Sequence, residues 1–427
     1  MNRCVIDKVS AIEILDSRGN PTLKVCLQAC GKTACASVPS GASTGKNEAF
    51  ELRDGERRVR GRGVRRAAAN ITDVVAQAIV GEDIENIRKI DDLLISIDGT
   101  ENKSKIGGNA IIGVSMAAAR LLSYVKEVPL YAVLGGALRR RIPTPLLNII
   151  NGGKHAGNPL SFQEFLLIPH GFSRFSDALW ASVEVYFSLK DRVKEKYGSI
   201  FTSVGDEGGF APPISEPEDA LKLISESVQA AGYRMEEDFS LGIDAAASSF
   251  FSEEEKMYRV SGKKIDAGEL MEIYIKLVDS YPVKLIEDPF AEDDFSMFAA
   301  ITEEMRRRKT IIVGDDLLTT NVKRLRMALE RRAVSAVLIK PNQVGTVSET
   351  VDFSVLALES GLKRVVSHRS GDTDDSFIAD LSIAIESEGI KTGAPARGER
   401  TSKYNRLLEV EWELDGEARY AGRSLFI

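Results

Sequence analysis

The stretch Val283-Lys284-Leu285-Ile286-Glu287 sets a pattern that recurs through the second half of the chain. A short aliphatic run ends in a charged side chain, and a segment of helical character follows before the next run begins. The residues that end these runs are Asp244, Glu287, Asp315, Lys340, His368 and Lys391. After a first interval of 43 residues they recur every 23 to 28 residues, about the length of one strand-helix unit.

This succession of strand-helix units predicts an α/β barrel, in which the carboxyl ends of successive strands meet at one mouth. The six end residues would then converge on a single pocket. Unrelated strand caps could explain any one of these residues, but they explain all six together poorly. The predicted fold class is therefore α/β, with a C-terminal α/β barrel and an N-terminal α+β capping domain.

The N-terminal part has a different pattern. Strands are expected first, and they are followed by helices rich in small apolar residues; the strands cover 5–15, 22–29 and 33–38, and the helices 67–79 and 109–124. The segment 135–143 combines glycines, arginines and a proline, so the domain boundary is placed there. Residues 1–138 are expected to form the N-terminal domain, and 139–427 the catalytic barrel.

The loop Ser40-Gly41-Ala42-Ser43-Thr44-Gly45-Lys46 ends like a nucleotide-binding loop. Only three residues separate Gly41 from Gly45, however, and Asn47 stands where a serine or threonine should follow the lysine. A mobile lid that closes on substrate fits this composition better. A plain surface linker is the alternative.

The composition is that of an ordinary globular protein, with 43% hydrophobic and 28% charged residues among 427. The longest apolar stretch, 110–122, is interrupted by Ser115 and Arg120, so it is expected to fall short of a membrane span. No apolar run with a cleavage site marks the first residues. We therefore expect a cytoplasmic protein with no membrane partner.

The formal net charge of −7 argues against nucleic acid as the main partner, because duplex binding needs a positive face. The basic run 57–66 could still touch polyanions. It contains no aromatic residues for base stacking, so a solvated loop and helix start is the preferred interpretation.

All four cysteines lie in the first thirty-five residues, at Cys4, Cys26, Cys30 and Cys35. Their spacing matches no CxxC pair, and no histidine lies nearby to complete a zinc site. We expect them to be small, reduced strand residues.

Asp244, Glu287 and Asp315 supply three carboxylates to the expected mouth. Hard oxygen ligands of this kind suit Mg²⁺, which leaves positions open for water and substrate. A purely structural ion is the alternative. Two lysines, Lys340 and Lys391, share the mouth; neighbouring positive charges would lower the pKa of each lysine, so either could act as a general base, or both could simply pair with the carboxylates.

Two further carboxyls, Glu164 and Glu207, are flanked by residues that would bury them. A buried carboxyl, or one beside a second carboxyl, keeps its proton near neutral pH and can act as a general acid. Arg369 and Ser370 offer a bidentate cationic fork and a hydroxyl, a combination that binds phosphate.

Taken together, these motifs resemble the enolase family, in the family's order and from about Glu13 to Gly422. The segments that carry the resemblance are 40–45, 148–158, 205–212, 286–290, 313–317, 339–343, 367–371 and 391–395, with 98–100 and 102–105 in the first domain. The resemblance implies an enolase-type (TIM-like) barrel and the magnesium-dependent conversion of 2-phospho-D-glycerate to phosphoenolpyruvate in glycolysis and gluconeogenesis. It also implies a homodimer or an octamer.

The resemblance implies a role for each matching residue. The first Mg²⁺ would be held by Asp244, Glu287 and Asp315, and a second ion, arriving with substrate, by Ser43. The catalytic residues would be Lys340 as base, Glu207 as acid supported by Glu164, with His155 and His368. The substrate contacts would be Ser43, His155, Gln163, Glu164, Glu287, Asp315, Lys340, Arg369, Ser370 and Lys391, of which His155, Arg369 and Ser370 face the phosphate and Lys391 the carboxylate.

Two other readings are open. Racemases and sugar-acid dehydratases of the same superfamily usually carry Lys-x-Lys on an early barrel strand, where this chain has Asp206-Glu207. A non-catalytic protein on the same scaffold would be expected to have lost catalytic residues, and none is missing. Ser249 and Gly108 depart from the family's usual pattern, at positions with no assigned chemistry.

Overall fold

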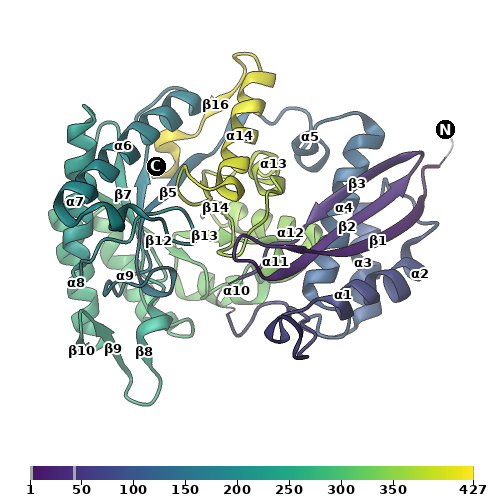
Figure 1. Cartoon of the computed structure of the whole chain (residues 1–427), viewed down its shortest axis with the longest axis horizontal. Helices are drawn as coiled ribbons and strands as arrows, with labels where there is room; N and C mark the ends of the chain where they lie inside the picture. Colours follow the sequence, from purple (N-terminus) through teal and green to yellow (C-terminus); the bar gives the residue numbers. More distant parts are fainter. Residues whose placement is uncertain (1–2, 42–44, 427) are drawn as a thin grey trace.

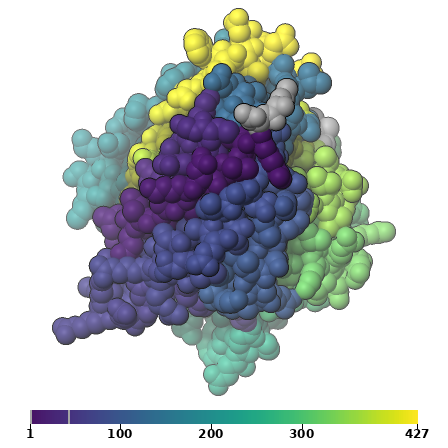
Figure 2. All heavy atoms as spheres, turned by 90° about the vertical axis from the view of Figure 1, so that its right-hand side faces the viewer, coloured from purple at the N-terminus to yellow at the C-terminus, as the bar shows by residue number. Residues whose placement is uncertain are grey.

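A computed structural model describes residues 3–41 and 45–426, which form an N-terminal part beside a closed barrel (Figure 1). The N-terminal part opens with an antiparallel sheet in the order β1-β2-β3, built from β1 (Ile6–Leu15), β2 (Pro21–Ala29) and β3 (Lys32–Ser37). Its helices are α1 (Arg65–Asn70), α2 (Ala76–Ile79), α3 (Ile87–Asp98), α4 (Gly108–Lys126) and α5 (Leu130–Gly135), with a π-helical segment, Ile71–Val75, joining the first two. Figure 2 shows the face that this part covers, with the strands in purple and the helices in blue.

Helix α4 packs against β2 and β3 and is the core helix of the N-terminal part. By length and composition it could cross a membrane, with 19 residues and a mean hydropathy of 1.2, so the expectation that this stretch falls short was wrong. However, 83% of its apolar window is buried inside the protein. Small side chains on α4 allow this close packing: Gly113, for example, lies against Val25 and Val38 of the sheet region.

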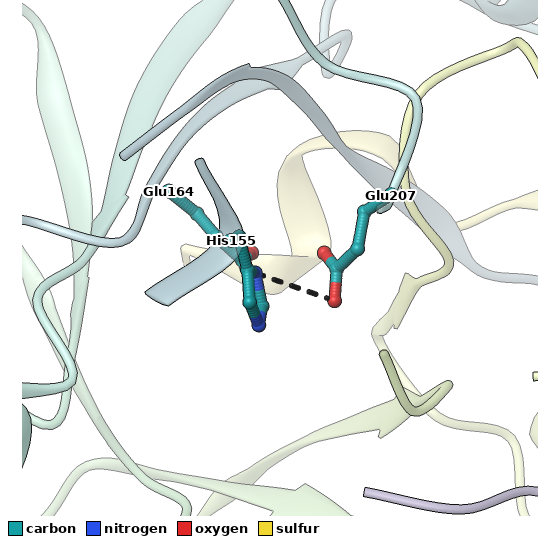
Figure 3. A group of neighbouring side chains, drawn as sticks. All are labelled: His155, Glu164 and Glu207. Carbon is teal, nitrogen blue, oxygen red and sulfur yellow. Dashed lines mark ion pairs between the residues drawn. The ribbon is translucent and has the colours of Figure 1, made fainter. Parts of the chain in front are cut away.

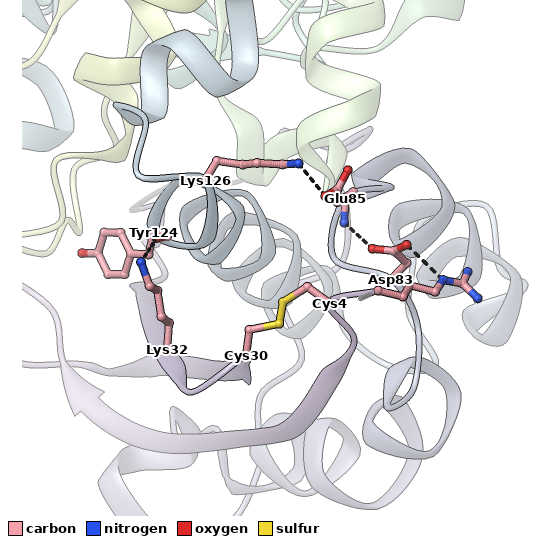
Figure 4. The surroundings of a disulfide bond; sticks show 8 residues. Cys4, Cys30, Lys32, Asp83, Glu85, Tyr124 and Lys126 are labelled. Carbon is pink, nitrogen blue, oxygen red and sulfur yellow. Dashed lines mark hydrogen bonds and ion pairs between the residues drawn. A yellow bond between two sulfur atoms is a disulfide. The ribbon is translucent and has the colours of Figure 1, made fainter. Parts of the chain in front are cut away.

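The four cysteines form two disulfides, Cys4–Cys30 and Cys26–Cys35, so the expectation of reduced cysteines is contradicted. Cys26 and Cys35 are direct partners in the register of β2 and β3, with their Cα atoms 4.1 Å apart. Cys30 begins the tight turn between these strands at φ 50°, and Gly31 follows at φ 73°, the positive values that such a two-residue hairpin turn needs. From this turn Cys30 reaches Cys4, which precedes β1 (Figure 4).

The second part is a closed eight-stranded barrel surrounded by helices. Around the barrel the strands follow the order β11-β12-β13-β14-β15-β5-β6-β7. Their bounds are β5 (Thr144–Asn151), β6 (Glu164–Ile168), β7 (Ser240–Asp244), β11 (Val283–Glu287), β12 (Ile311–Gly314), β13 (Ala336–Ile339), β14 (Lys363–Ser367) and β15 (Gly389–Lys391). The fold class expected from the sequence is confirmed.

The barrel is not wholly parallel, because β6 runs antiparallel to both β5 and β7. The first residue of β6, rather than its last, therefore lies at the mouth where the other strands end. That residue is Glu164, which pairs in register with Asp244, the last residue of β7. The strand-end pattern could not have predicted this reversal.

Helices cover the outside of the barrel (Figure 1). The helices of this part are α6 (Phe175–Tyr197), α7 (Pro217–Ala230), α8 (Ala267–Ser280), α9 (Phe295–Arg307), α10 (Val322–Arg331), α11 (Pro341–Val344), α12 (Val347–Glu359), α13 (Phe377–Ala384) and α14 (Gly398–Glu413). The short α11 directly follows Lys340 and therefore lies at the mouth. Side chains that accept hydrogen bonds from the first helical turn fix the start of several of these helices, namely Asp266, Asp294, Asn321 and Thr346. The remaining strands are β4 (Arg141–Ile142), paired with β16 (Arg419–Tyr420), and a small sheet of β8 (Phe251–Ser252), β9 (Met257–Val260) and β10 (Lys263–Ile265).

Inside the barrel, aliphatic side chains form a separate cluster below the mouth, including Leu146, Leu166, Leu285 and Val313. Leu425, near the end of the chain, belongs to this cluster and is fully buried. The barrel is therefore a packed core rather than a pore, and polar chemistry is confined to its upper end.

A buried ion pair fixes the N-terminal part against the barrel. Arg120 of α4 donates to both oxygens of Asp375, at 2.8 and 2.6 Å, and the backbone N–H of Ser37 donates to the same carboxylate. Ser37 ends β3, so this contact sets the position of the loop that leads from the sheet to the barrel mouth.

Candidate active site

A cavity of about 260 Å³ lies at the carboxyl-end mouth of the barrel, and Gly41, Gly45 and Lys46 of the N-terminal part line one side of it. Most of the side chains expected at the site line this cavity: His155, Gln163, Glu164, Glu207, Asp244, Asp315, Lys340, His368, Arg369, Ser370 and Lys391. Glu287 lies next to them, 1% exposed and bonded to Lys391. Ser43 lies outside the described residues.

The strand ends explain this convergence. Glu287 and Lys391 are the last residues of β11 and β15, and three more of the expected side chains directly follow a strand: Asp315 after β12, Lys340 after β13 and His368 after β14. The sequence analysis therefore placed these residues correctly at one mouth.

Lys391 is the ionic centre of the site. Its ammonium nitrogen lies 2.9 Å from Asp244 Oδ2, 2.9 Å from both carboxylate oxygens of Glu287 and 3.0 Å from Glu164 Oε2. Burial disfavours the charged ammonium, but these carboxylates outweigh it and raise the pKa of Lys391 well above its usual range. Burial and the nearby Asp244 likewise raise the pKa of Glu287.

Lys340 forms an ion pair with Asp315. Burial and the positive charges of Arg369 and Lys391 lower the pKa of Lys340, and the adjacent Asp315 carboxylate raises it. The effect of the carboxylate is larger, so the pKa of Lys340 lies above its usual value. The lowered pKa is expected for lysines beside a divalent cation; without that cation the carboxylates raise the pKa of both Lys340 and Lys391. Each ammonium group is in direct contact with a carboxylate, Lys340 with Asp315 and Lys391 with Asp244 and Glu287.

Acidic groups capable of holding a metal ion are present at the mouth. Among the described residues, two sets have ligand atoms within 4.8 Å of one another: Asp288, Asp315 and Asp316, and His155, Glu164 and Glu207. The expected set of Asp244, Glu287 and Asp315 is not one of these groups; Lys391 instead donates to Asp244 and Glu287, and Lys340 pairs with Asp315. All three are nevertheless buried oxygen donors around one cavity, a chemistry that fits Mg²⁺.

Asp288 is a site residue that the sequence analysis missed. Its carboxylate accepts hydrogen bonds from the backbone N–H groups of Asp315 and Asp316, at 2.9 and 2.7 Å, and so fixes the turn that presents Asp315. Burial and the charge of Asp315 raise the pKa of Asp316 to about 7. The signal was available, because Asp288 directly follows Glu287 in a recognised motif.

On the other side of the cavity, His155, Glu164 and Glu207 point toward one another (Figure 3). The Nδ1 atom of His155 lies 3.5 Å from Glu164 Oε1 and 3.6 Å from Glu207 Oε1. Burial and the charge of Glu207 raise the pKa of Glu164 well above its usual range. Burial acts in the same direction on Glu207, but His368, His155 and Arg400 hold the pKa of Glu207 low. The pKa values of these two neighbouring carboxyls are therefore displaced in opposite directions, upward for Glu164 and downward for Glu207.

His368 and Arg400 support Glu207. Arg400 donates to Nδ1 of His368 at 2.7 Å, which leaves the ring proton on Nε2, 3.3 Å from Glu207 Oε2. Burial lowers the pKa of His368 to about 4, so the ring is neutral near pH 7. Asn148 also donates to Glu207, at 3.0 Å. Neither Arg400 nor Asn148 was assigned a role from the sequence, because nothing in their spacing links them to the mouth.

Arg369 and Ser370, two of the residues expected to bind phosphate, lie next to the N-terminal part. Arg369 donates to both oxygens of Glu48, at 2.9 and 3.2 Å, and to Asn342 Oδ1 at 3.1 Å. Ser370 follows it, and the Ser370 carbonyl oxygen accepts a hydrogen bond from Arg400. Gln163 directly precedes β6, and its backbone N–H donates to the carbonyl oxygen of Asp244.

Two family models together match nearly the whole chain. The one described as "Enolase, N-terminal domain" matches residues 6–134, and the one described as "Enolase, C-terminal TIM barrel domain" matches residues 139–427. Similar curated proteins carry the same name. An enolase of Methanopyrus kandleri is 50% identical over 422 residues, covering 99% of both chains. An enolase of Aeropyrum pernix is 49% identical over 426 residues, covering 100% of this chain and 98% of that protein.

Proposed function

The chain belongs to the enolase family, and from that membership we propose which of its residues carry out the family's reaction. This reaction is the reversible dehydration of 2-phospho-D-glycerate to phosphoenolpyruvate, and the enzyme is a phosphopyruvate hydratase, a carbon-oxygen lyase of glycolysis. Removing water from this substrate requires a base at the hydrogen on C2 and an acid at the hydroxyl on C3.

The observation that carries the assignment is the position of these two functions around the barrel. Lys340 follows β13 and Glu164 begins β6, and these strands are four apart in either direction around eight. Base and acid candidates therefore face each other across the cavity. A substrate bound between them would present its C2 hydrogen to one side and its C3 hydroxyl to the other.

Lys340 is the proposed base, and Lys391 the proposed partner of the substrate carboxylate. The C2 hydrogen is very weakly acidic, so negative charge that develops on the carboxylate has to be stabilised in place. The Lys391 ammonium is held among three carboxylates and cannot readily lose its proton, which suits a fixed positive charge rather than a base. Lys340 forms its ion pair with one carboxylate, that of Asp315.

Glu207 is the proposed acid, with Glu164 as its support. The His155 Nδ1 atom lies near both carboxyls, 3.5 Å from Glu164 Oε1 and 3.6 Å from Glu207 Oε1. To protonate the departing hydroxyl, Glu207 has to hold a proton, and the neighbouring Glu164, whose pKa is raised by burial and by the charge of Glu207, is the carboxyl that would supply it. His368, neutral and donating toward Glu207, would hold that carboxyl in place.

The phosphate of the substrate is assigned to His155, Arg369 and Ser370, with Gln163 as a further substrate contact. Arg369 presents a planar, permanently charged fork suited to phosphate oxygens. Its side chain is 4% exposed, so a phosphate there would be shielded from water.

Asp244, Glu287 and Asp315 would hold a first Mg²⁺ ion, and Ser43 a second that arrives with substrate. When bound, Mg²⁺ would neutralise these carboxylates and offset the negative charge that develops on the substrate carboxylate. The burial of all three carboxylates and their hard oxygen donors support this proposal.

The wider context is also proposed. We divide the chain at 138/139, next to the ends of the two matched family segments. We propose a homodimer or octamer in the cytoplasm that acts on a small-molecule substrate, without nucleic acid or membrane partners. Two disulfides are uncommon in the cytosol of mesophiles but regular in intracellular proteins of hyperthermophiles. Light scattering would measure the oligomeric state.

The direct test of the function is the appearance of phosphoenolpyruvate absorbance after 2-phosphoglycerate is added, with and without Mg²⁺. We expect product only with the metal. Absence of product at any Mg²⁺ concentration would contradict the proposed function.

A further inference from the structure

We propose that Glu48, in the N-terminal part, is a positioning residue for the phosphate site: it holds the Arg369 guanidinium in the orientation that receives the substrate phosphate. The inference rests on the proposed assignment of Arg369 to phosphate. None of the roles derived above includes Glu48, although its side chain is as deeply buried as that of Arg369, at 4% exposure each.

The two side chains form a bidentate ion pair. Arg369 Nη1 donates to Glu48 Oε2 at 2.9 Å, and Nη2 donates to Oε1 at 3.2 Å. Two parallel hydrogen bonds fix the plane of a guanidinium as well as its distance. In addition, Asn342 Oδ1 accepts from Nη1 at 3.1 Å. The orientation of Arg369 is therefore set by the protein before any substrate binds.

Glu48 is itself held from two directions. Its Oε1 atom accepts from the backbone N–H of Gly45 at 3.0 Å, while the Glu48 N–H donates to the Gly45 carbonyl oxygen at 3.2 Å. Gln343 Nε2 approaches the same Oε1 at 3.5 Å and donates to Asp315 Oδ1 at 3.0 Å. The Gln343 carbonyl oxygen accepts from the backbone N–H of Ala49. Glu48 thus links the segment lining the cavity to Arg369 and, through Gln343, to a proposed metal ligand.

A purely structural role is the alternative, in which Glu48 only anchors the N-terminal part to the barrel. The chain contains a matched pair of that kind. Arg88 of α3 donates to both oxygens of Asp352 of α12, at 2.6 Å each, so it also joins the two parts by a bidentate ion pair, but at an exposed position that does not line the cavity. Arg88→Gln is therefore the control for loss of anchoring.

Two opposing effects act when Glu48 loses its charge. Without the carboxylate, Arg369 is no longer held and the substrate has to order it, which raises KM. The carboxylate also repels a phosphate dianion, and removing it would lower KM. We expect ordering to dominate, because two parallel hydrogen bonds to Glu48 fix the plane of the guanidinium, and losing them frees a long side chain that the substrate must then immobilise.

The experiment compares Glu48→Gln, Glu48→Asp, Arg369→Gln and the double variant Glu48→Gln/Arg369→Gln, with thermal unfolding as a check on folding. Glu48→Gln should raise KM for 2-phosphoglycerate about tenfold, the cost of ordering one long side chain, with a smaller change in kcat. Glu48→Asp, which keeps the charge, should fall between it and the parent enzyme. The double variant should be no worse than Arg369→Gln alone, since Glu48 acts through Arg369.

Each alternative outcome has a distinct meaning. Equal effects of Glu48→Gln and Arg88→Gln on KM, additive effects in the double variant, or tighter substrate binding by Glu48→Gln would each overturn the positioning role. If Arg369→Gln leaves KM unchanged while the parent enzyme turns over 2-phosphoglycerate, the phosphate assignment fails and the inference fails with it. If the parent enzyme forms no phosphoenolpyruvate, the proposed function itself fails.

Discussion

Lys340 and Glu164 occupy opposite points of the barrel mouth, since one follows β13 and the other begins β6, four strands away around the closed ring of eight. The same separation holds for Glu287 on β11 and Lys391 on β15, yet those two side chains meet at 2.9 Å across the mouth. The ion pair of Glu287 and Lys391 thus bridges one pair of opposite strands. On the other pair of opposite strands, the proposed base Lys340 lies at one end, and Glu164, the proposed support of the acid, lies at the other.

The first prediction separates the base from the acid. Lys340→Ala should abolish exchange of the C2 hydrogen of 2-phosphoglycerate with solvent. Glu207→Gln should block dehydration by about 10²- to 10⁴-fold but spare some exchange, because the base is intact. Deuterium incorporation followed by NMR measures exchange, and phosphoenolpyruvate absorbance measures dehydration. Lys222→Ala, at an exposed lysine of α7, is the control; the same behaviour of both active-site variants would contradict the assignment.

The second prediction concerns Lys391 as a counter-charge for Asp244, Glu287 and Glu164. Lys391→Met leaves three buried carboxylates without their ammonium group, so without metal it should destabilise the fold by about 3–5 kcal/mol. A divalent cation can replace part of that charge, so Mg²⁺ should recover more stability in the variant than in the parent. Urea unfolding in EDTA and in Mg²⁺ measures both; an identical Mg²⁺ effect in the two proteins would refute the idea.

The third prediction concerns the disulfides. In the chain-entropy description, closing the longer loop, Cys4–Cys30, stabilises by about 3.5 kcal/mol and closing Cys26–Cys35 by about 2.5 kcal/mol. The loops overlap, so the two effects should not add fully. Thermal unfolding with and without dithiothreitol measures the loss, and a variant with all four cysteines replaced by serine should be insensitive to the reductant. Four alkylatable thiols in denatured, unreduced protein would show that the bonds are absent.

The fourth prediction follows from His170 at the lower end of the barrel. Burial lowers the pKa of His170 to about 4, from about 6.5 in an unfolded chain. Between these values the unfolded chain binds a proton that the folded protein does not, so stability is complete above pH 6.5 and falls as the pH drops toward 4. The slope from this group is at most about 1.4 kcal/mol per pH unit. His170→Gln should flatten the pH profile of unfolding; parallel profiles would contradict the prediction.

The sequence predicted the barrel and most of its mouth because both depend on local pattern. Asp244, Glu287 and Lys391 end apolar runs, and a run of that length can be recognised without knowing its neighbours. The reversed direction of β6 could not be recognised in this way, since an apolar strand looks the same in either direction. Glu164 reached the site prediction through its buried surroundings and the family resemblance instead.

What the sequence could not supply were contacts between distant segments. The Cys26–Cys35 bond requires the register of two strands, and Glu48 meets Arg369 across 321 positions of chain. The direction of the pKa shift of Lys340 in this arrangement depends on such contacts too. Two lysines at one mouth suggest mutual repulsion, but the sign of the shift depends on which carboxylate each ammonium touches.

The packing of Leu425 into the lower end of the barrel bears on how the enzyme is handled in the laboratory. Phe426 beside it lies edge-on to His170, with ring centroids 5.6 Å apart. Residues 425 and 426 therefore pack against the lower end of the barrel core. An affinity tag fused directly after these residues could pull Leu425 and Phe426 out of their packed positions at the lower end of the barrel. A tag carried at the other terminus, or behind a flexible spacer, avoids that strain.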